Sequence, residues 1–209
     1  MKKTFYMLPR QCGKTTMAIM EFLRSPETTL IITFNQKTAK DIQNKIKQTD
    51  PNISQMALDN ILPAIPNIIL NRCTGKSYDK VIFDEYMSFK DNYFTTEIMI
   101  YLQPCLSQNS ELIIYSSADR VYSKKVFDFL RNMPNMSMAE RLKEHALFSE
   151  EEKADFDRLN KTFLSDLEFK IITSTPYQYS VNYHKMKVDR EKCIGKEAYD
   201  MEISNIFLK

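Results

Sequence analysis

The first residues able to do chemistry lie near the start of the chain, where Gly13, Lys14 and Thr15 follow one another. A phosphate-binding loop has the pattern Gly-x-x-x-x-Gly-Lys-Ser/Thr between a strand and a helix. Leu8 stands at the position of the first glycine, so only the second half of the pattern is present. Backbone N–H groups around Gly13 and at the start of the following helix would still bind phosphates. We therefore predict a nucleotide-binding loop formed by Pro9, Arg10, Gln11, Cys12, Gly13, Lys14, Thr15 and Thr16.

Two adjacent acids, Asp84 and Glu85, end an apolar run that begins at Val81. Unpaired carboxylates beside apolar surface are costly, and a magnesium ion would give them a role. Thr15 and Asp84 would hold Mg²⁺, while Lys14 would contact the β- and γ-phosphates. Glu85 would polarise the attacking water as general base, so the pattern predicts Mg²⁺-dependent ATP hydrolysis. The alternatives are a chance Gly-Lys-Thr at a helix start and a strand that runs into a solvated loop.

Four further residues are candidates for assisting the reaction. Ser116 and Ser117 end the next predicted strand, and ligands of parallel sheets bind beyond the carboxyl ends of strands. Their hydroxyls would sense the γ-phosphate and couple its loss to movement, although serine is also a common turn former. Arg10 in the loop and Arg72 before the acidic strand would neutralise transition-state charge, from the same subunit or a neighbour. The alternative for each arginine is a surface salt bridge.

The elements that position these residues alternate between strands and helices. Short apolar runs predict strands at residues 3–8, 28–34, 81–85, 112–115 and 169–173. Apolar residues at helical spacing predict helices at residues 13–23, 36–48, 53–62, 93–106, 123–131, 136–147, 149–164 and 192–207. This order predicts an α/β fold with a mainly parallel central sheet flanked by helices, as in P-loop NTPases of the RecA/ASCE-like class.

The character of the sequence changes after Pro134, where charged amphipathic helices are predicted. We expect a P-loop ATPase core at residues 1–133. Residues 134–209 would form a small helical, lid-like subdomain with a returning strand and a closing helix. The acidic run that begins at Glu150 is interpreted as a solvated helix face without chemistry.

Composition limits the class of protein. Hydrophobic residues make up 43% and charged residues 27%, which is ordinary for a soluble globular protein. No apolar run is long enough to span a bilayer, so no membrane partner is expected. The four cysteines lack Cys-x-x-Cys spacing, which argues against a zinc site. The formal net charge of +2 neither shows nor excludes a nucleic-acid partner.

The loop and the acidic strand resemble those of a known family. The run Arg10-Gln11-Cys12-Gly13-Lys14-Thr15 resembles the Arg-Gln-x-Gly-Lys-Ser/Thr loop of tailed-phage terminase large subunits, the ATPases that pump DNA into capsids. That family commonly lacks the first glycine, which matches Leu8. Residues 78–85 are similar to its Walker B strand, and weaker similarity extends over residues 30–41, 102–117 and 195–207. Ser116-Ser117-Ala118 stands where its coupling motif is expected, with alanine in place of proline. The run Ser174-Thr175-Pro176 spells that motif better but follows Asp84 at too great a distance.

The resemblance implies a motor domain that uses ATP and Mg²⁺ to translocate double-stranded viral DNA into a procapsid. It implies a portal or procapsid and a small terminase subunit as partners, and a homo-oligomeric ring as the active form. It places the protein in the cytoplasm of the infected host cell. In the family a nuclease domain would begin near Lys209, where this sequence stops. Residues 185–196 are a candidate DNA-contacting region.

Two other functions stay open. The chain could be a helicase-like, DNA-stimulated ATPase, which strand separation would reveal. It could instead be a nucleotide-gated DNA- or protein-binding module without significant turnover, although the acid at Glu85 argues for hydrolysis.

Overall fold

The computed structural model describes residues 1–8, 13–85, 98–116, 123–160, 167–171 and 192. Six strands form one sheet in the order β3-β2-β4-β5-β1-β6, and all the described strand pairs are parallel. The strands are β1 (Lys2–Met7), β2 (Thr29–Thr33), β3 (Ile61–Pro63), β4 (Tyr78–Asp84), β5 (Leu106–Ser116) and β6 (Leu167–Ile171). The helices are α1 (Lys14–Arg24), α2 (Gln36–Thr49), α3 (Gln55–Leu58), α4 (Pro66–Cys73), α6 (Lys124–Asn132), α7 (Met138–Ala146) and α8 (Glu150–Asn160). Residues 98–102 are also helical.

Side chains that alternate along the strands enter two separate cores, one on each face of the sheet. On β2, Leu30 and Ile32 belong to one core, whereas Ile31 belongs to the other. The first core is completed by α4, residues 98–102, α6 and α8, and the second by α1, α2 and α3. Because both faces are covered, the central strands are buried on both sides, as the continuous apolar runs in the sequence predicted.

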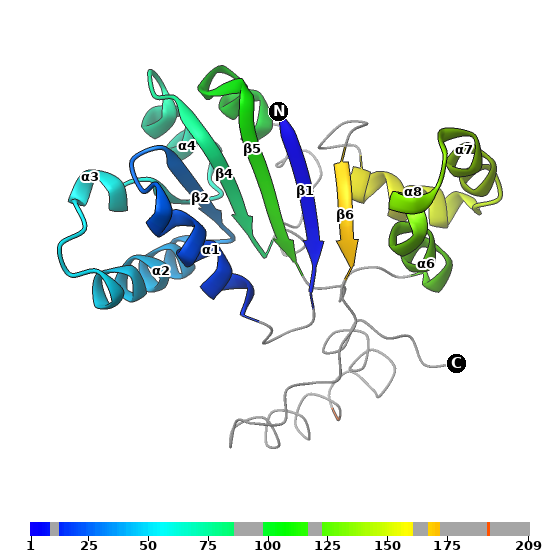
Figure 1. Cartoon of the computed structure of the whole chain (residues 1–209), viewed down its shortest axis with the longest axis horizontal. Coiled ribbons are helices and arrows are strands. Elements are labelled where there is room, and N and C mark those ends of the chain that lie inside the picture. Colours follow the sequence, from blue (N-terminus) through cyan, green and yellow to red (C-terminus); the bar gives the residue numbers. More distant parts are fainter. Residues whose placement is uncertain (9–12, 86–97, 117–122, 161–166, 172–191, 193–209) are drawn as a thin grey trace.

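The strand order places β5 between β1, which leads into the loop, and β4, which ends in the acids. The predicted α/β fold, with a mainly parallel central sheet flanked by helices, is confirmed. All arrowheads of the long strands point to the same edge of the sheet, where α1 begins (Figure 1). The carboxyl ends of β1, β4 and β5 therefore lie at one edge of the sheet, which is where the sequence predicted the nucleotide-binding residues.

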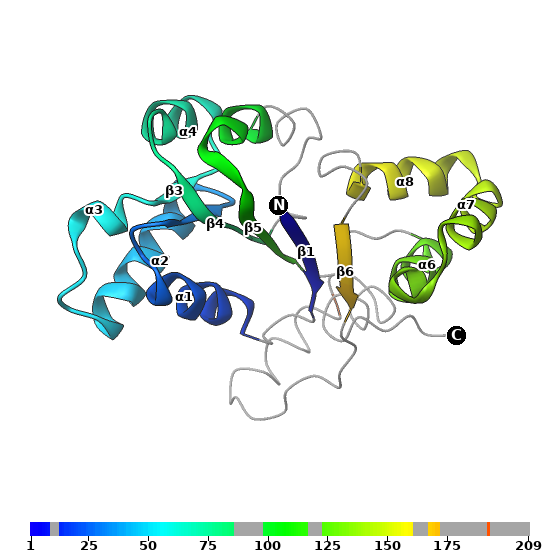
Figure 2. The same ribbon diagram turned by 45° about the horizontal axis from the view of Figure 1, so that its top comes forward.

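Helices α6, α7 and α8 group beside β6, at the end of the sheet away from α1 and α2 (Figure 2). β6 returns to pair with β1 and becomes the strand at that end. The division of the chain at residue 133 stays a prediction. The closing helix predicted at 192–207 lies outside the described residues, apart from residue 192.

Two predicted elements were wrong in part. Of the helix predicted at 53–62, only α3 is helical, and Ile61 and Leu62 form β3. These two side chains are buried and pair with Ile31 and Ile32, so tertiary burial decides between helix and strand. The helix predicted at 93–106 ends earlier, because residues 103–105 form a 3-10 turn and β5 begins at Leu106. The part at 93–97 lies outside the described residues.

Candidate nucleotide-binding site

The N-terminus of α1 lies at the carboxyl edge of the sheet and begins with Gly13 as its N-cap. Gly13 has φ 78°, a left-handed conformation that glycine adopts at little cost. No hydrogen bond from a described side chain caps the helix, so its first N–H groups remain available to an anion. An uncapped helix N-terminus that follows a glycine turn is a suitable site for phosphate.

Thr15, in the first turn of α1, contacts the acid at the end of β4. Its hydroxyl Oγ1 donates to Asp84 Oδ2 at 3.0 Å. Asp84 is 1% exposed, and its other oxygen, Oδ1, has no hydrogen-bond partner among the described residues. A buried carboxylate oxygen without a donor is costly unless something absent from the chain meets it. Hydroxyl and carboxylate oxygens are the ligands that Mg²⁺ prefers, so Thr15 and Asp84 fit a magnesium site.

Burial is the main reason that the pKa of Asp84 is raised, from 3.8 to about 6. The hydrogen bond from Thr15 lowers it, the charge of Glu85 raises it, and the charges of Lys14 and Lys45 lower it. A divalent cation beside Asp84 would favour the ionised carboxylate. The site is thus electrostatically unfavourable without a cation.

Lys14 and Glu85 form an ion pair in the same place. Lys14 Nζ lies 3.1 Å from Glu85 Oε1 and, at the limit of a hydrogen bond, 3.5 Å from the Leu8 carbonyl oxygen. Lys14 is 4% exposed, whereas the Glu85 side chain is 35% exposed. The ammonium that would bind phosphate is therefore held by the carboxylate that would activate water.

The backbone of Glu85 has φ 56°, the one positive φ of a non-glycine residue in the described part of the chain. This conformation costs about 1–2 kcal/mol for a residue with a side chain. Backbone strain of this kind is concentrated at functional sites. The left-handed conformation changes the chain direction directly after Asp84, and the carboxylates of Asp84 and Glu85 contact Thr15 and Lys14, respectively.

Ser116 ends β5 between the loop strand and the acidic strand. It is fully buried and pairs in register with Met7, and its carbonyl oxygen accepts from the Leu8 N–H at 2.9 Å. On the other side of β5, Tyr115 pairs in register with Asp84 of β4. Ser116 therefore lies at the same edge of the sheet as Asp84, and its coupling role stays a prediction. Ser117 lies outside the described residues.

Arg72 does not lie near these residues. It is in the last turn of α4, before the start of β4, and forms a 3.5 Å ion pair with Asp59, which precedes β3. The length of β4, about 20 Å at 3.3 Å per residue, separates this edge from Asp84. The prediction that Arg72 neutralises transition-state charge is therefore wrong within one subunit, and only an action on a neighbouring subunit stays a prediction. Pro9, Arg10, Gln11 and Cys12 lie outside the described residues.

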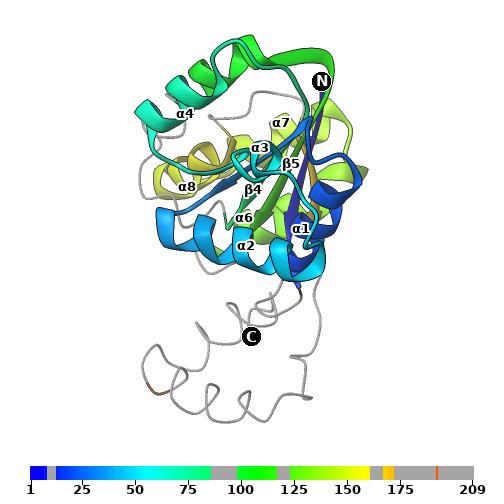
Figure 3. The same ribbon diagram turned by 90° about the vertical axis from the view of Figure 1, so that its left-hand side faces the viewer.

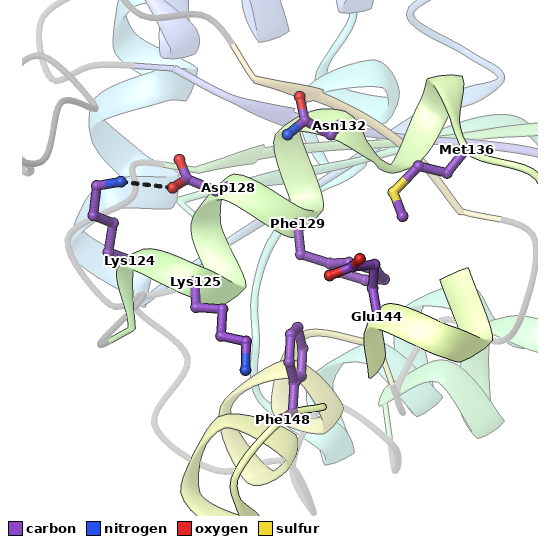
Figure 4. A pocket seen from close by; sticks show the side chains of 8 residues that line it. All are labelled: Lys124, Lys125, Asp128, Phe129, Asn132, Met136, Glu144 and Phe148. Atoms are coloured by element: carbon purple, nitrogen blue, oxygen red, sulfur yellow. Dashed lines mark hydrogen bonds and ion pairs between the residues drawn. The ribbon is translucent and has the colours of Figure 1, made fainter. Parts of the chain in front are cut away.

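A cavity of about 650 Å³ lies elsewhere, between α6, α7 and the segment that joins α7 to α8 (Figure 4). Its lysines are already engaged, because Lys124 pairs with Asp128 at 2.8 Å and Lys125 Nζ lies 3.5 Å from Glu152. It shares no lining residue with the α1–β4 site. The cavity therefore offers less to a phosphate than the N-terminus of α1 does.

One contact and one electrostatic effect were not predicted: the Lys14–Glu85 ion pair, and the lowering of the Asp84 pKa by the charge of Lys45. Lys45 lies on α2, and its signal in the sequence is the lysine-rich exposed side of that helix. No group of acidic, histidine or cysteine side chains among the described residues could hold a metal by itself, and Cys73 and Cys105 are free thiols. In the described part of the chain, no helix is both long and apolar enough to cross a bilayer.

Comparisons with known proteins give partial matches. No protein-family model matches the chain. Replicase protein 1a and replicase polyprotein 1ab of Grapevine leafroll-associated virus 3 (isolate United States/NY1) are each 32% identical over 80 residues. The match covers 38% of this chain and only 3% of the length of either replicase. In structure, the chain is similar to the helicase domain of Pyrococcus furiosus Hef, with a TM-score of 0.45 and 13% identity over 92% of this chain and 42% of that one.

Proposed function

We propose that the protein is a Mg²⁺-dependent nucleoside triphosphatase that hydrolyses ATP and uses the energy to move along nucleic acid. The observation that carries the proposal is the meeting of α1 and β4. Thr15 donates to Asp84 at 3.0 Å, and Lys14 pairs with Glu85 at 3.1 Å, although each pair is about 70 residues apart in sequence. A merely structural ion pair would not require an Asp84 oxygen that lacks a partner in the described part of the chain, nor the left-handed backbone of Glu85.

In the proposed mechanism the Lys14–Glu85 pair is the resting state. Incoming phosphates, bound by the N–H groups of α1, carry more charge than one carboxylate and would draw Lys14 toward them. Glu85 would then accept a proton from the attacking water. Thr15 and Asp84 would hold Mg²⁺ through their oxygens. Mg²⁺, when bound, neutralises the charge that develops on the phosphates.

For the work coupled to hydrolysis, a helicase-like role is the first candidate. It is supported by the likeness of 80 residues to a viral protein named as a replicase. The second candidate is translocation of double-stranded viral DNA into a procapsid by a ring of subunits, with a portal and a small terminase subunit as partners. The loop from Arg10 to Thr15 favours it, because it resembles the terminase loop.

Phosphate release from ATP, with and without Mg²⁺, tests the hydrolysis. Lys14→Ala and Glu85→Gln should each lower the rate about a hundredfold or more. Lys143→Ala on α7 and Glu151→Gln on α8 are controls for the same types of change at exposed positions, and should retain the wild-type rate. Turnover that is unaffected in both site variants would exclude this site as the origin of the activity.

Strand displacement distinguishes the two candidates for coupled work. Separation of a forked duplex by the chain with ATP supports the helicase-like role. Stimulation by double-stranded DNA without separation supports packaging. ATP binding without turnover, with either nucleic acid present, would instead support a nucleotide-gated binding module.

A further inference from the structure

One face of α2 carries lysines that point away from the core. Lys37, Lys40, Asn44 and Lys47 follow one another at helical spacing and are all exposed. We call these four residues the basic face of α2. The buried residues Ala39, Ile42 and Ile46 lie on the opposite side of the helix. The basic face is therefore turned to solvent along the length of the helix.

The lysines of the basic face differ from those of α6 and α8, though not from Lys143 of α7, in having no ion pair with a described acid. None of them forms an ion pair with a described residue, and α2 contains one acid, Asp41, against four lysines. In contrast, the lysines of α6 and α8 are paired with acids of the same two helices, as Figure 4 shows for Lys124 and Asp128. A concentration of unpaired positive charge attracts polyanions.

The basic face also begins close to the nucleotide site. α2 follows β2, whose last residue, Thr33, pairs in register with Asp84. α1 and α2 lie side by side (Figure 3). Lys45, on the flank of the basic face, is near enough for its charge to act on Asp84. A ligand on this face would thus lie beside the helix that bears Lys14 and Thr15.

We propose that the basic face of α2 binds the phosphate backbone of nucleic acid. From Lys37 to Lys47 the helix rises about 15 Å. That length matches about four successive phosphates of a strand at 3.4 Å of helix rise each. Lysine contacts of this kind are independent of base sequence, as a moving enzyme requires. The inference rests on the proposed function, because it assigns the nucleic-acid contact of that NTPase.

Binding of a labelled 20-nucleotide single strand and a 20-base-pair duplex, measured by fluorescence anisotropy at several salt concentrations, tests the proposal. The variant is Lys40→Gln/Lys47→Gln. The matched control, Arg131→Gln/Lys143→Gln, removes the same two charges from exposed positions on α6 and α7. Loss of two phosphate contacts should reduce the slope of log affinity against log salt by about 1.4 for the single strand and about 1.8 for the duplex. The control should keep the wild-type slope.

Equal slopes for wild type and the α2 variant, or equal losses in both variants, would overturn the proposal. The proposal would also be overturned if the α2 variant bound nucleic acid as the wild type does while light scattering showed that its oligomer dissociates, because the face would then bind a second copy of the chain. ATP turnover of the wild type is measured in the same samples. If the wild type hydrolyses ATP but the α2 variant binds nucleic acid as well as the wild type does, only the role of the basic face is refuted. If the α2 variant binds nucleic acid more weakly but the wild type hydrolyses no ATP, the proposed NTPase activity is refuted and the nucleic-acid-binding surface is supported.

Discussion

Replacing the buried acid of the site should make the nucleotide-free protein more stable at neutral pH while removing its function. Burial raises the pKa of Asp84 from 3.8 to about 6, so the folded protein favours the protonated acid. The contribution of protonated Asp84 to the free energy of unfolding is fully present below pH 3.8 and is lost as the pH rises through about 6. At pH 8 ionised Asp84 therefore lowers the free energy of unfolding by about 3 kcal/mol. About 2 kcal/mol of this change falls between pH 4 and pH 8.

Asp84→Asn removes this titration and keeps an oxygen that can accept from Thr15. The free energy of unfolding of the variant, minus that of the wild type, should therefore rise by about 2 kcal/mol from pH 4 to pH 8. Urea denaturation without nucleotide or Mg²⁺ measures both proteins at each pH. Asp128→Asn is the control, because the Asp128 side chain on α6 is half-buried and pairs with Lys124 at the surface; its difference in unfolding free energy from wild type should change by less than about 1 kcal/mol over this pH range.

Adding ligand should reverse the order of the two proteins. Mg²⁺ and ATP at about a hundred times their dissociation constant stabilise a binding protein by about 2.7 kcal/mol. The wild type should show this gain and Asp84→Asn should not. A stability difference that is flat or falls with pH would contradict the reasoning about a destabilised carboxylate. Equal stabilisation of both proteins by Mg²⁺ and ATP would contradict the assignment of Asp84 as a magnesium ligand.

Three further changes give separate predictions. Glu85→Gln should bind ATP severalfold more tightly while losing turnover, because Lys14 no longer shares its charge with a carboxylate. Equilibrium binding of a labelled nucleotide measures the affinity, and an unchanged affinity would refute the resting-state ion pair. Gly13→Ala should cost about 1 kcal/mol in urea denaturation from its φ of 78° alone, since the added Cβ meets nothing closer than Thr16 Cβ at 3.9 Å; a loss above about 3 kcal/mol would indicate a clash instead. Phe22→Ala should cost about 3–5 kcal/mol, because this fully buried ring fills the core between α1 and the sheet; a midpoint close to wild type would show that the core is not packed there.

The sequence predicted the sheet and its covering helices because each central strand is a short apolar run between clear breaks. The two faces separate as alternate residues of β2 and β4, which is the period expected of strands. The sequence did not distinguish helix from strand at Ile61 and Leu62, because the apolar run there is too short to show a helical or a strand period. The result there depends on pairing with Ile31 and Ile32, which are distant in sequence.

The site could be predicted as a set of residues but not as a set of contacts. Lys14 and Glu85 meet because β1 and β4 both run parallel to β5 in the strand order and so end at the same edge of the sheet, where Glu85 adopts a left-handed conformation. Neither feature has a local sequence signal, since strand order and a positive φ at glutamate arise from the whole fold. For Arg72, nearness to the acidic strand in sequence was misleading, because that residue precedes the start of β4 rather than its end.

Phosphate release from ATP by the 209-residue chain tests whether the N-terminus of α1 and the end of β4 form an NTPase site. It is measured with Mg²⁺, with Mg²⁺ removed by chelation, and for Lys14→Ala. If the N-terminus of α1 and the end of β4 form an NTPase site, the wild type releases phosphate only with Mg²⁺ and Lys14→Ala loses about a hundredfold or more of that rate. No release by the wild type under any of these conditions, or equal release by wild type and Lys14→Ala, would contradict the claim.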